Sequence, residues 1–244
     1  MPQAVAGTPY CGAAPLPGAV AWNLDPWLGA VLLAGLALAW WVTGDRRSLL
    51  IGWGVLAALL LSPLCNLSVA LFSARVAQHV VLLIASAPLL AVAIPLRRAY
   101  GPGRLALAAG LFAVVLWAWH LPGPYALTFR SDLAYWAMQS SLMGAGVWLW
   151  RGLLLGAAAR PDAVLLVGLA TAAQMGALGA LLTFAPRPLF APHLLSTLPW
   201  GLTALEDQQL GGLLMWVPGG LAFALVALPG LARALRGEAG ALRP

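Results

Sequence analysis

Charged residues are scarce in this chain of 244 residues, of which 8% are charged and 62% are hydrophobic. A soluble domain carries roughly a quarter charged residues, so the composition excludes an ordinary soluble domain and predicts a membrane protein. Lysine is absent, and all 13 basic residues are arginine. This absence excludes a retinal-binding protein, because retinal forms its Schiff base with a lysine.

The sequence also lacks the usual motifs of enzymes and metal sites. It has only two cysteines, Cys11 and Cys65, and contains neither a CxxC nor an HExxH motif. No set of nucleophile, base and acid suggests a hydrolase. We therefore expect a protein that is not an enzyme. The first 25 residues contain no Lys or Arg and no apolar core, which is unlike a signal peptide.

Long apolar runs make up most of the chain, and a helix needs about 20 such residues to cross a membrane. Their spacing predicts an all-α bundle of seven transmembrane helices, 26–43, 49–70, 76–96, 104–120, 132–150, 163–184 and 208–230. We expect one transmembrane domain over 26–236, with a tail at each end, 1–25 and 237–244.

The arginines alternate between the connections, as positively charged residues do when they mark the cytoplasmic side. Three connections contain only Arg75, Arg130 and Arg187. The alternate connections contain the other ten, Arg46, Arg47, Arg97, Arg98, Arg104, Arg151, Arg160, Arg233, Arg236 and Arg243. This pattern predicts an outer N-terminus and a cytoplasmic C-terminus. The net charge of +6 therefore indicates topology, and we expect no nucleic-acid partner.

The rare hydrophilic and sulfur-containing side chains are expected near the outer membrane face. His79 lies one turn inside the third run, and His120 ends the fourth. His193 lies in the last outer loop, where we expect it to be exposed to solvent. Met138 and Met215 share the depth of the first two histidines. Imidazole and thioether groups are copper ligands, so this set favours a metal site.

The stretch EDQQ, residues 206–209, opens the last apolar run. Thr203 and Glu206 have the spacing of a capping box, so Glu206 either caps its own helix or belongs to a site. Capping does not account for Asp207 and Gln208, and such residues at membrane depth usually face the bundle interior. Asp207 also shares a helix face with Gly211 and Met215, spaced by four residues. Gly211 and Gly212 allow another helix to approach closely.

Arg75 and His79 are four residues apart, so they lie on one face of the third run. Arg75 either forms an ion pair with Asp207 or Glu206, or extends to the membrane surface. His79 is either a ligand or a hydrogen-bonded helix residue. We predict a polar network of Arg75, Gln78, Glu206, Asp207 and Gln208 beside His79.

The chain resembles the polytopic CtaG family of cytochrome c oxidase assembly factors. Its most specific motif is LEDQQLGGLLMWVPGG at 205–220. The supporting motifs, in chain order, are WNLDPWL at 22–28, LSPL at 61–64, LFSARVAQHVVLLIASAPLL at 71–90, WAWHLPGPY at 117–125 and LGALLTFAPRPLF at 178–190. The family often has a histidine at the positions of Arg75 and Ser140, so this chain lacks two possible ligands.

The resemblance implies a bacterial inner-membrane protein that helps a haem–copper oxidase to mature, with oxidase subunits or other assembly factors as partners. A copper site would use His79, His120, Met215 and Cys65, with Asp207 orienting them. Cys11 and Cys65 could instead form a disulfide, because both face the outer compartment. Two further functions stay open: a metal-free chaperone or scaffold for oxidase subunits, and a haem-handling protein with axial histidines.

Overall fold

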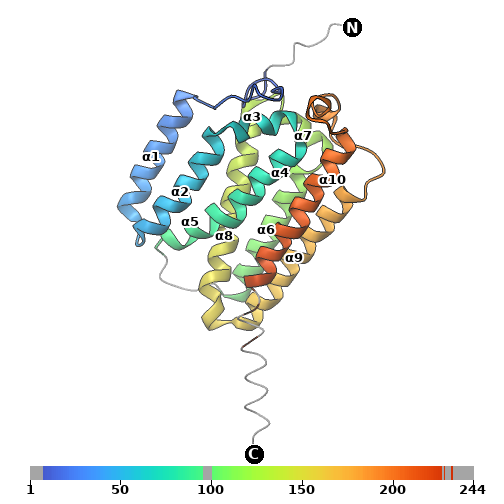
Figure 1. Cartoon of the computed structure of the whole chain (residues 1–244). Coiled ribbons are helices and arrows are strands. Elements are labelled where there is room, and N and C mark those ends of the chain that lie inside the picture. The colour runs from blue at the N-terminus through green and yellow to red at the C-terminus, as the bar shows by residue number, and fades with distance from the viewer. Residues whose placement is uncertain (1–7, 96–100, 227, 229–231, 233–244) are drawn as a thin grey trace, which may run out of the picture.

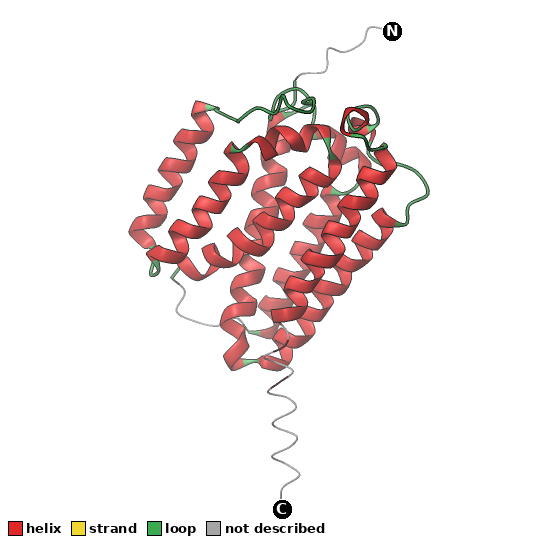
Figure 2. Cartoon of the chain, viewed as in Figure 1, coloured by secondary structure: helices red, strands yellow, loops and turns green. Residues whose placement is uncertain are grey.

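The computed structural model describes residues 8–95, 101–226, 228 and 232, and these residues form a helical bundle without strands (Figures 1 and 2). The helices are α1 (Pro26–Val42), α2 (Arg46–Leu61), α3 (Pro63–Ala70), α4 (Phe72–Val81), α5 (Ala87–Ala93), α6 (Pro102–Trp119), α7 (Pro122–Leu127), α8 (Asp132–Ala159), α9 (Pro161–Thr183) and α10 (Ala204–Leu214). Two π-helical turns, η1 (Leu82–Ser86) and η4 (Met215–Gly219), and two 3₁₀ turns, η2 (Ala191–His193) and η3 (Leu198–Trp200), complete the described elements.

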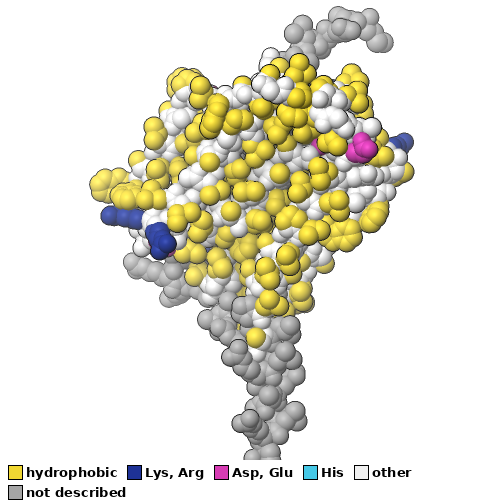
Figure 3. Space-filling model, viewed as in Figure 1, with side chains coloured by type: hydrophobic (Ala, Val, Ile, Leu, Met, Phe, Trp, Pro, Cys, Tyr) yellow, Lys and Arg dark blue, Asp and Glu magenta, His cyan; other side chains and the backbone are white. Residues whose placement is uncertain are grey.

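Four helices in the described part of the chain are long and apolar enough to cross a membrane. They are Phe72–Ala93, Pro102–Trp119, Pro161–Thr183 and Ala204–Val226. A fifth span results if α2 and α3 are counted as one bent helix, and α1 is a shorter apolar helix. Hydrophobic side chains cover most of the face drawn in Figure 3, and the few charged ones lie near its margins. The chain is therefore a helical membrane protein.

The second predicted run, 49–70, is broken between α2 and α3. The two helices meet at an angle of 50°. Ser62 ends α2, its side chain accepts a hydrogen bond from the Leu64 amide, and Pro63 is the first residue of α3. A proline disfavours helical geometry at the residue before it, which explains the bend after α2.

Prolines also explain the two π-helical turns. Pro88 follows η1, and Pro218 lies within η4. Because a proline has no amide hydrogen, it leaves a carbonyl of the preceding turn without its helical partner. The wider turn of η1 presents the Leu83 carbonyl to α8, where the indole of Trp150 donates a hydrogen bond to it at 2.5 Å. The distortion therefore joins α8 to the long helix formed by α4, η1 and α5.

Glycines bring α10 against two other helices, as the sequence predicts for Gly211 and Gly212. A Cβ atom on Gly212 would lie 2.7 Å from the carbonyl oxygen of Gly179 in α9. A Cβ atom on Gly211 would lie 2.6 Å from the ring of Phe72 in α4. Both distances are shorter than real Cβ contacts, so only glycine permits these two crossings. The close approach to α4 places the start of α10 beside the start of α4.

A disulfide between Cys11 and Cys65 fixes the segment before α1 to α3. Asn66, the next residue in α3, donates hydrogen bonds to the carbonyls of Cys11 and Ala13, both at 2.9 Å. These contacts cover one end of the bundle with residues 8–25, seen above α3 in Figure 1. Some predicted features lie outside the described residues: Arg97, Arg98, Arg233, Arg236, Arg243 and the tail 237–244.

Candidate functional site

The buried carboxylate of Asp207 caps the start of α4. It accepts hydrogen bonds from the backbone amides of Phe72 at 2.6 Å and Ser73 at 3.1 Å, and from the hydroxyl of Ser73. The first amides of a helix lack partners within the helix, and Leu71, at the N-cap of α4, has no side-chain hydrogen bond to offer them. Asp207 of α10 therefore supplies the cap that the sequence of α4 lacks.

Glu206, the neighbouring acid, caps its own helix. Its carboxylate accepts a hydrogen bond from the Thr203 amide at 2.8 Å, and its own amide donates to the Thr203 hydroxyl at 3.2 Å. This reciprocal pair is the capping box that the Thr203–Glu206 spacing predicts. The two adjacent acids thus stabilise the starts of two different helices.

The two buried glutamines of the predicted network bind backbone groups rather than each other. Gln208 accepts a hydrogen bond from the Leu189 amide at 2.6 Å and donates to the Leu182 carbonyl at 3.2 Å, which fixes the loop after α9. Gln78 donates to the Leu59 carbonyl of α2 at 2.8 Å. Both side chains are almost fully buried. Their contacts join neighbouring elements of the bundle.

Arg75 is buried, with 2% of its surface exposed, but it does not pair with Asp207 or Glu206. The ion pair found among the described residues joins Arg160 to Asp162, at the connection between α8 and α9. Asp207 is unavailable to Arg75 because backbone amides and Ser73 use its oxygens. The predicted ion pair of Arg75 is therefore wrong, and so is its predicted extension to the membrane surface.

Aromatic rings surround the guanidinium of Arg75 instead. Its Cζ atom lies 4.2 Å from the ring centroid of Phe129, 5.2 Å from that of Tyr125 and 5.9 Å from that of Tyr135. One nitrogen donates a hydrogen bond to the Thr128 hydroxyl at 2.7 Å. Aromatic faces attract cations, but they do not cancel a full charge. Arg75 therefore keeps a positive charge inside the bundle, close to His79.

His79 and His120 lie together with Met138 around a small enclosed space, which we call the histidine niche. Its walls are Phe72, Arg75, Val76, His79, Trp119, His120, Tyr125 and Met138. The space is too narrow to admit a water molecule. Three elements supply its possible copper ligands: His79 comes from α4, His120 follows α6, and Met138 belongs to α8. The niche thus unites side chains that are far apart in the sequence.

The hydrogen bonds of the two histidines differ. Nδ1 of His120 lies 2.7 Å from the Leu116 carbonyl oxygen, which can only accept, so Nδ1 carries the proton and Nε2 keeps its lone pair. Nε2 of His79 is buried and makes no hydrogen bond of normal geometry in the described part of the chain, although the Gln139 side chain lies close enough to interact with the ring. A buried polar atom without a partner is costly, so this nitrogen is a candidate ligand atom.

Two of the four predicted copper ligands do not line the niche. Cys65 is joined to Cys11 in a disulfide, and a disulfide sulfur is not the thiolate that binds metals. Met215 is buried in the π-helical turn after α10 and is not one of the niche residues. Met138, by contrast, contributes to the wall. No group of three His, Cys, Asp or Glu residues suits a metal ion among the described residues.

His193 is buried rather than exposed, which corrects the expectation for this loop residue. Its Nε2 lies 2.6 Å from the Tyr125 hydroxyl, and its Nδ1 lies 3.2 Å from the Ala70 carbonyl oxygen. Burial lowers the pKa of His193 to about 3, so the ring is neutral at pH 7. The loop folds inward because Phe190 stacks on Phe72, with ring centroids 4.3 Å apart.

Several residues that shape this region are not among the predicted site residues. Thr128 and Tyr135 hold or surround the Arg75 guanidinium, and Gln139 lies one turn from Tyr135 in α8, donating a hydrogen bond to its hydroxyl at 3.0 Å. The sequence indicates only their depth in the membrane, because these polar residues lie near the outer ends of the fourth and fifth apolar runs. Depth does not indicate which face of a helix a residue occupies.

The donor types of the niche fit Cu(I), which binds imidazole and thioether groups. His79 and His120 offer two imidazoles and Met138 offers one thioether, while Arg75 adds an opposing positive charge. A family model described as cytochrome c oxidase caa3 assembly factor matches residues 30–236. No curated protein and no solved structure matches the chain.

Proposed function

The chain belongs to the cytochrome c oxidase caa3 assembly factor family, and we propose that it holds Cu(I) transiently in the histidine niche for delivery to a haem–copper oxidase. In this proposal His79 and His120 bind the ion, and Met138 supplies a soft third ligand. Met138 replaces Met215 and Cys65 of the sequence prediction, because neither of those lines the niche. Oxidase subunits or other assembly factors receive the ion.

The buried Nε2 of His79 is the observation that carries this proposal. It makes no hydrogen bond of normal geometry among the described residues, with the Gln139 side chain as a loose neighbour, and it lies in a niche shared with His120 and Met138. Leaving a buried acceptor or donor unsatisfied costs about 1–3 kcal/mol. A ligand role explains why such an atom is retained. Because the niche is too narrow for water, copper entry requires its walls to separate.

Copper binding is tested on the purified full chain with a chromophoric Cu(I) chelator as competitor. We expect one Cu(I) per chain, and we expect His79→Ala and His120→Ala each to weaken binding by about tenfold or more, since loss of even an outer-shell partner of a metal site costs about 10–100-fold in affinity. Met138→Leu should weaken it less. Met175→Leu is the matched control, because Met175 is equally buried but lies outside the niche.

The same titration distinguishes the other functions. If the wild-type protein binds no Cu(I), or if both histidine variants bind it as tightly as the wild type, the copper proposal is wrong. Oxidase subunits that still co-purify with the double histidine variant would then support a metal-free scaffold. A Soret band on the purified protein would instead indicate a haem-handling protein.

We place the histidine niche near the outer face of a bacterial cytoplasmic membrane, in a chain that crosses seven times from an outer N-terminus. The alternation of arginines supports this orientation. A cysteine introduced by Leu195→Cys, at a site that is 78% exposed, should react with a membrane-impermeant maleimide on intact cells. A cysteine introduced by Arg47→Cys should react only after the cells are opened. The reverse result would invert the topology.

A further inference from the structure

Tyr135 of α8 lies between the Cys11–Cys65 disulfide and the wall of the histidine niche. Its hydroxyl oxygen is 3.4 Å from Sγ of Cys11 and 3.7 Å from Sγ of Cys65. Its ring centroid is 5.9 Å from Cζ of Arg75, which lines the niche. The Tyr135 side chain is almost fully buried. Tyr135 thus contacts a redox-active group and a residue of the proposed copper site at the same time.

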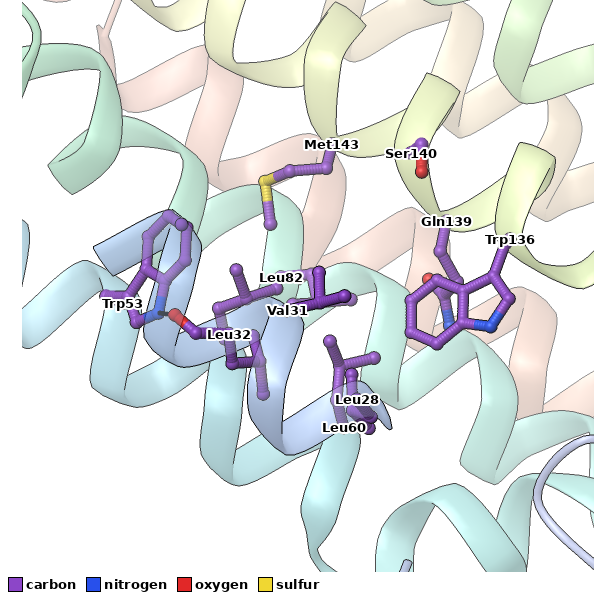
Figure 4. Close-up of a pocket in the computed structure, with 12 residues that line it drawn as sticks. Leu28, Val31, Leu32, Trp53, Leu60, Leu82, Trp136, Gln139, Ser140 and Met143 are labelled. Carbon is purple, nitrogen blue, oxygen red and sulfur yellow. Dashed lines mark hydrogen bonds between the residues drawn. The ribbon is translucent and has the colours of Figure 1, made fainter. Parts of the chain in front are cut away.

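Gln139 extends these contacts from Tyr135 to His79. It lies one turn after Tyr135 in α8, and its amide nitrogen donates a hydrogen bond to the Tyr135 hydroxyl at 3.0 Å. The same side chain lies close enough to the His79 ring to interact with it. Figure 4 shows Gln139 beside Trp136, at the edge of an apolar cavity between α1, α2, η1 and α8. The disulfide, Tyr135, Gln139 and His79 therefore form one continuous series of contacts.

The neighbours of Tyr135 fix its orientation. Its oxygen accepts the hydrogen bond from Gln139, and a disulfide sulfur has no hydrogen to donate, so the hydroxyl hydrogen points toward the sulfurs of Cys11 and Cys65. Tyr10, from the segment before α1, stacks on the Tyr135 ring with the centroids 5.0 Å apart. Tyr135 in turn sets the position of the Gln139 amide beside the niche.

Reduction of the disulfide forces these contacts to change. Two thiol sulfurs cannot stay at bonding distance, so Sγ of Cys11 and Sγ of Cys65 must move apart. Cys65 and Tyr135 are buried, and a close-packed interior passes a displacement on to its neighbours. Because the Tyr135 hydroxyl touches both sulfurs, it cannot keep its position against both of them. Its hydrogen bond to Gln139 then weakens, and the support that Gln139 gives to the His79 ring weakens with it.

We propose that Tyr135 and Gln139 are positioning residues that couple the Cys11–Cys65 disulfide to His79. The niche then holds copper while the disulfide is formed and releases it when the disulfide is reduced, an inference that rests on the copper function proposed above. The reductant is a dithiol, which attacks Sγ of Cys11, the more exposed of the two cysteines, and displaces Cys65. The disulfide gains two electrons and two protons and becomes two thiols, and the dithiol becomes a disulfide.

The coupling is tested first on copper affinity, by the same chelator competition. Cys11→Ser combined with Cys65→Ser, the serine pair, imitates the reduced cysteines without offering a thiolate to copper. We expect the serine pair to weaken Cu(I) binding by about tenfold, as loss of an outer-shell partner does. Tyr135→Phe, which keeps the ring and removes the hydroxyl, should weaken it by the same factor. Tyr10→Phe is the matched control and should bind as the wild type does, because the Tyr10 hydroxyl bonds to Asp25 instead.

Combining the changes shows whether they act through one route. The serine pair together with Tyr135→Phe should cost about tenfold in total, because the second change finds the contact already removed. A loss of about a hundredfold would show that the disulfide and Tyr135 act independently, and it would overturn the proposal. An affinity that the serine pair leaves unchanged would overturn it as well.

A second measurement needs no copper. The chain has three histidines, so nitrogen NMR of the protein with isotope-labelled histidine resolves each ring. Adding a small dithiol to the wild type should shift the His79 signals clearly more than those of His120 and His193, whose hydrogen-bond partners lie outside the series of contacts. No shift at His79, or equal shifts at all three rings, would overturn the coupling even if copper binds. A selective shift at His79 in a protein that binds no copper would support the coupling and refute the copper function.

Discussion

Asp207→Ala should lower the free energy of unfolding by about 3–5 kcal/mol. This is the largest loss of stability that we expect from replacing a single buried polar residue. The substitution removes a carboxylate that accepts from the Phe72 and Ser73 amides and from the Ser73 hydroxyl, all inside the protein. Each buried donor left without a partner costs about 1–3 kcal/mol. The measurement is equilibrium unfolding of the purified protein in mixed micelles.

Two comparisons make this result specific. Asp207→Asn keeps one carbonyl oxygen and should lose about half as much stability as Asp207→Ala. Glu206→Ala removes an exposed capping group of α10 and should cost clearly less than Asp207→Ala, because water replaces its hydrogen bonds. A loss for Asp207→Ala no larger than that for Glu206→Ala would contradict the cap across helices. It would also remove the explanation for why α4 begins at Phe72.

The sequence predicts the parts of the fold that depend on local patterns. Apolar runs indicate the helices, and Thr203 with Glu206 indicates the capping box that the structure confirms. Adjacent glycines at 211 and 212 indicate a close crossing, and α4 and α9 both pack there. The bend at Ser62 and the π-helical turns are also local effects of proline. The sequence does not predict that the run 49–70 is broken into α2 and α3, which changes the number of spans that can be counted. A broken apolar run and a continuous one have the same composition.

The polar contacts were predicted less well, because they depend on backbone groups that composition does not reveal. The sequence offers Arg75 either an acidic partner, because buried charges usually pair, or an extension to the membrane surface, and the structure shows neither. The start of α4 competes for the same carboxylate, and its amides win because they have no other partner. His193 shows the same difficulty for a loop: its burial depends on the stacking of Phe190 on Phe72.

The charge of Arg75, which has no acidic partner in the part of the chain that the structure describes, has a direct consequence for a cation bound in the histidine niche. Arg75 and His79 are one helical turn apart, which corresponds to roughly 6 Å between their Cβ atoms. Two positive charges at that distance repel by about 3 kcal/mol at an effective dielectric constant of about 20. Arg75 therefore weakens copper binding, and an ion that is bound weakly is released easily to an acceptor. Salt does not screen this repulsion well, because Arg75 is buried.

Arg75→Gln should accordingly tighten Cu(I) binding by tens of times up to on the order of a hundredfold, measured by the chelator competition described above. Glutamine removes the charge and offers no sulfur or imidazole ligand. Arg75→Lys is the matched control, since it keeps the positive charge and should bind copper as the wild type does. The tighter variant should also release its ion more slowly to an excess of chelator. An unchanged affinity in Arg75→Gln, in a protein that otherwise binds Cu(I) through His79 and His120, would show that the ion binds too far from Arg75 to feel its charge.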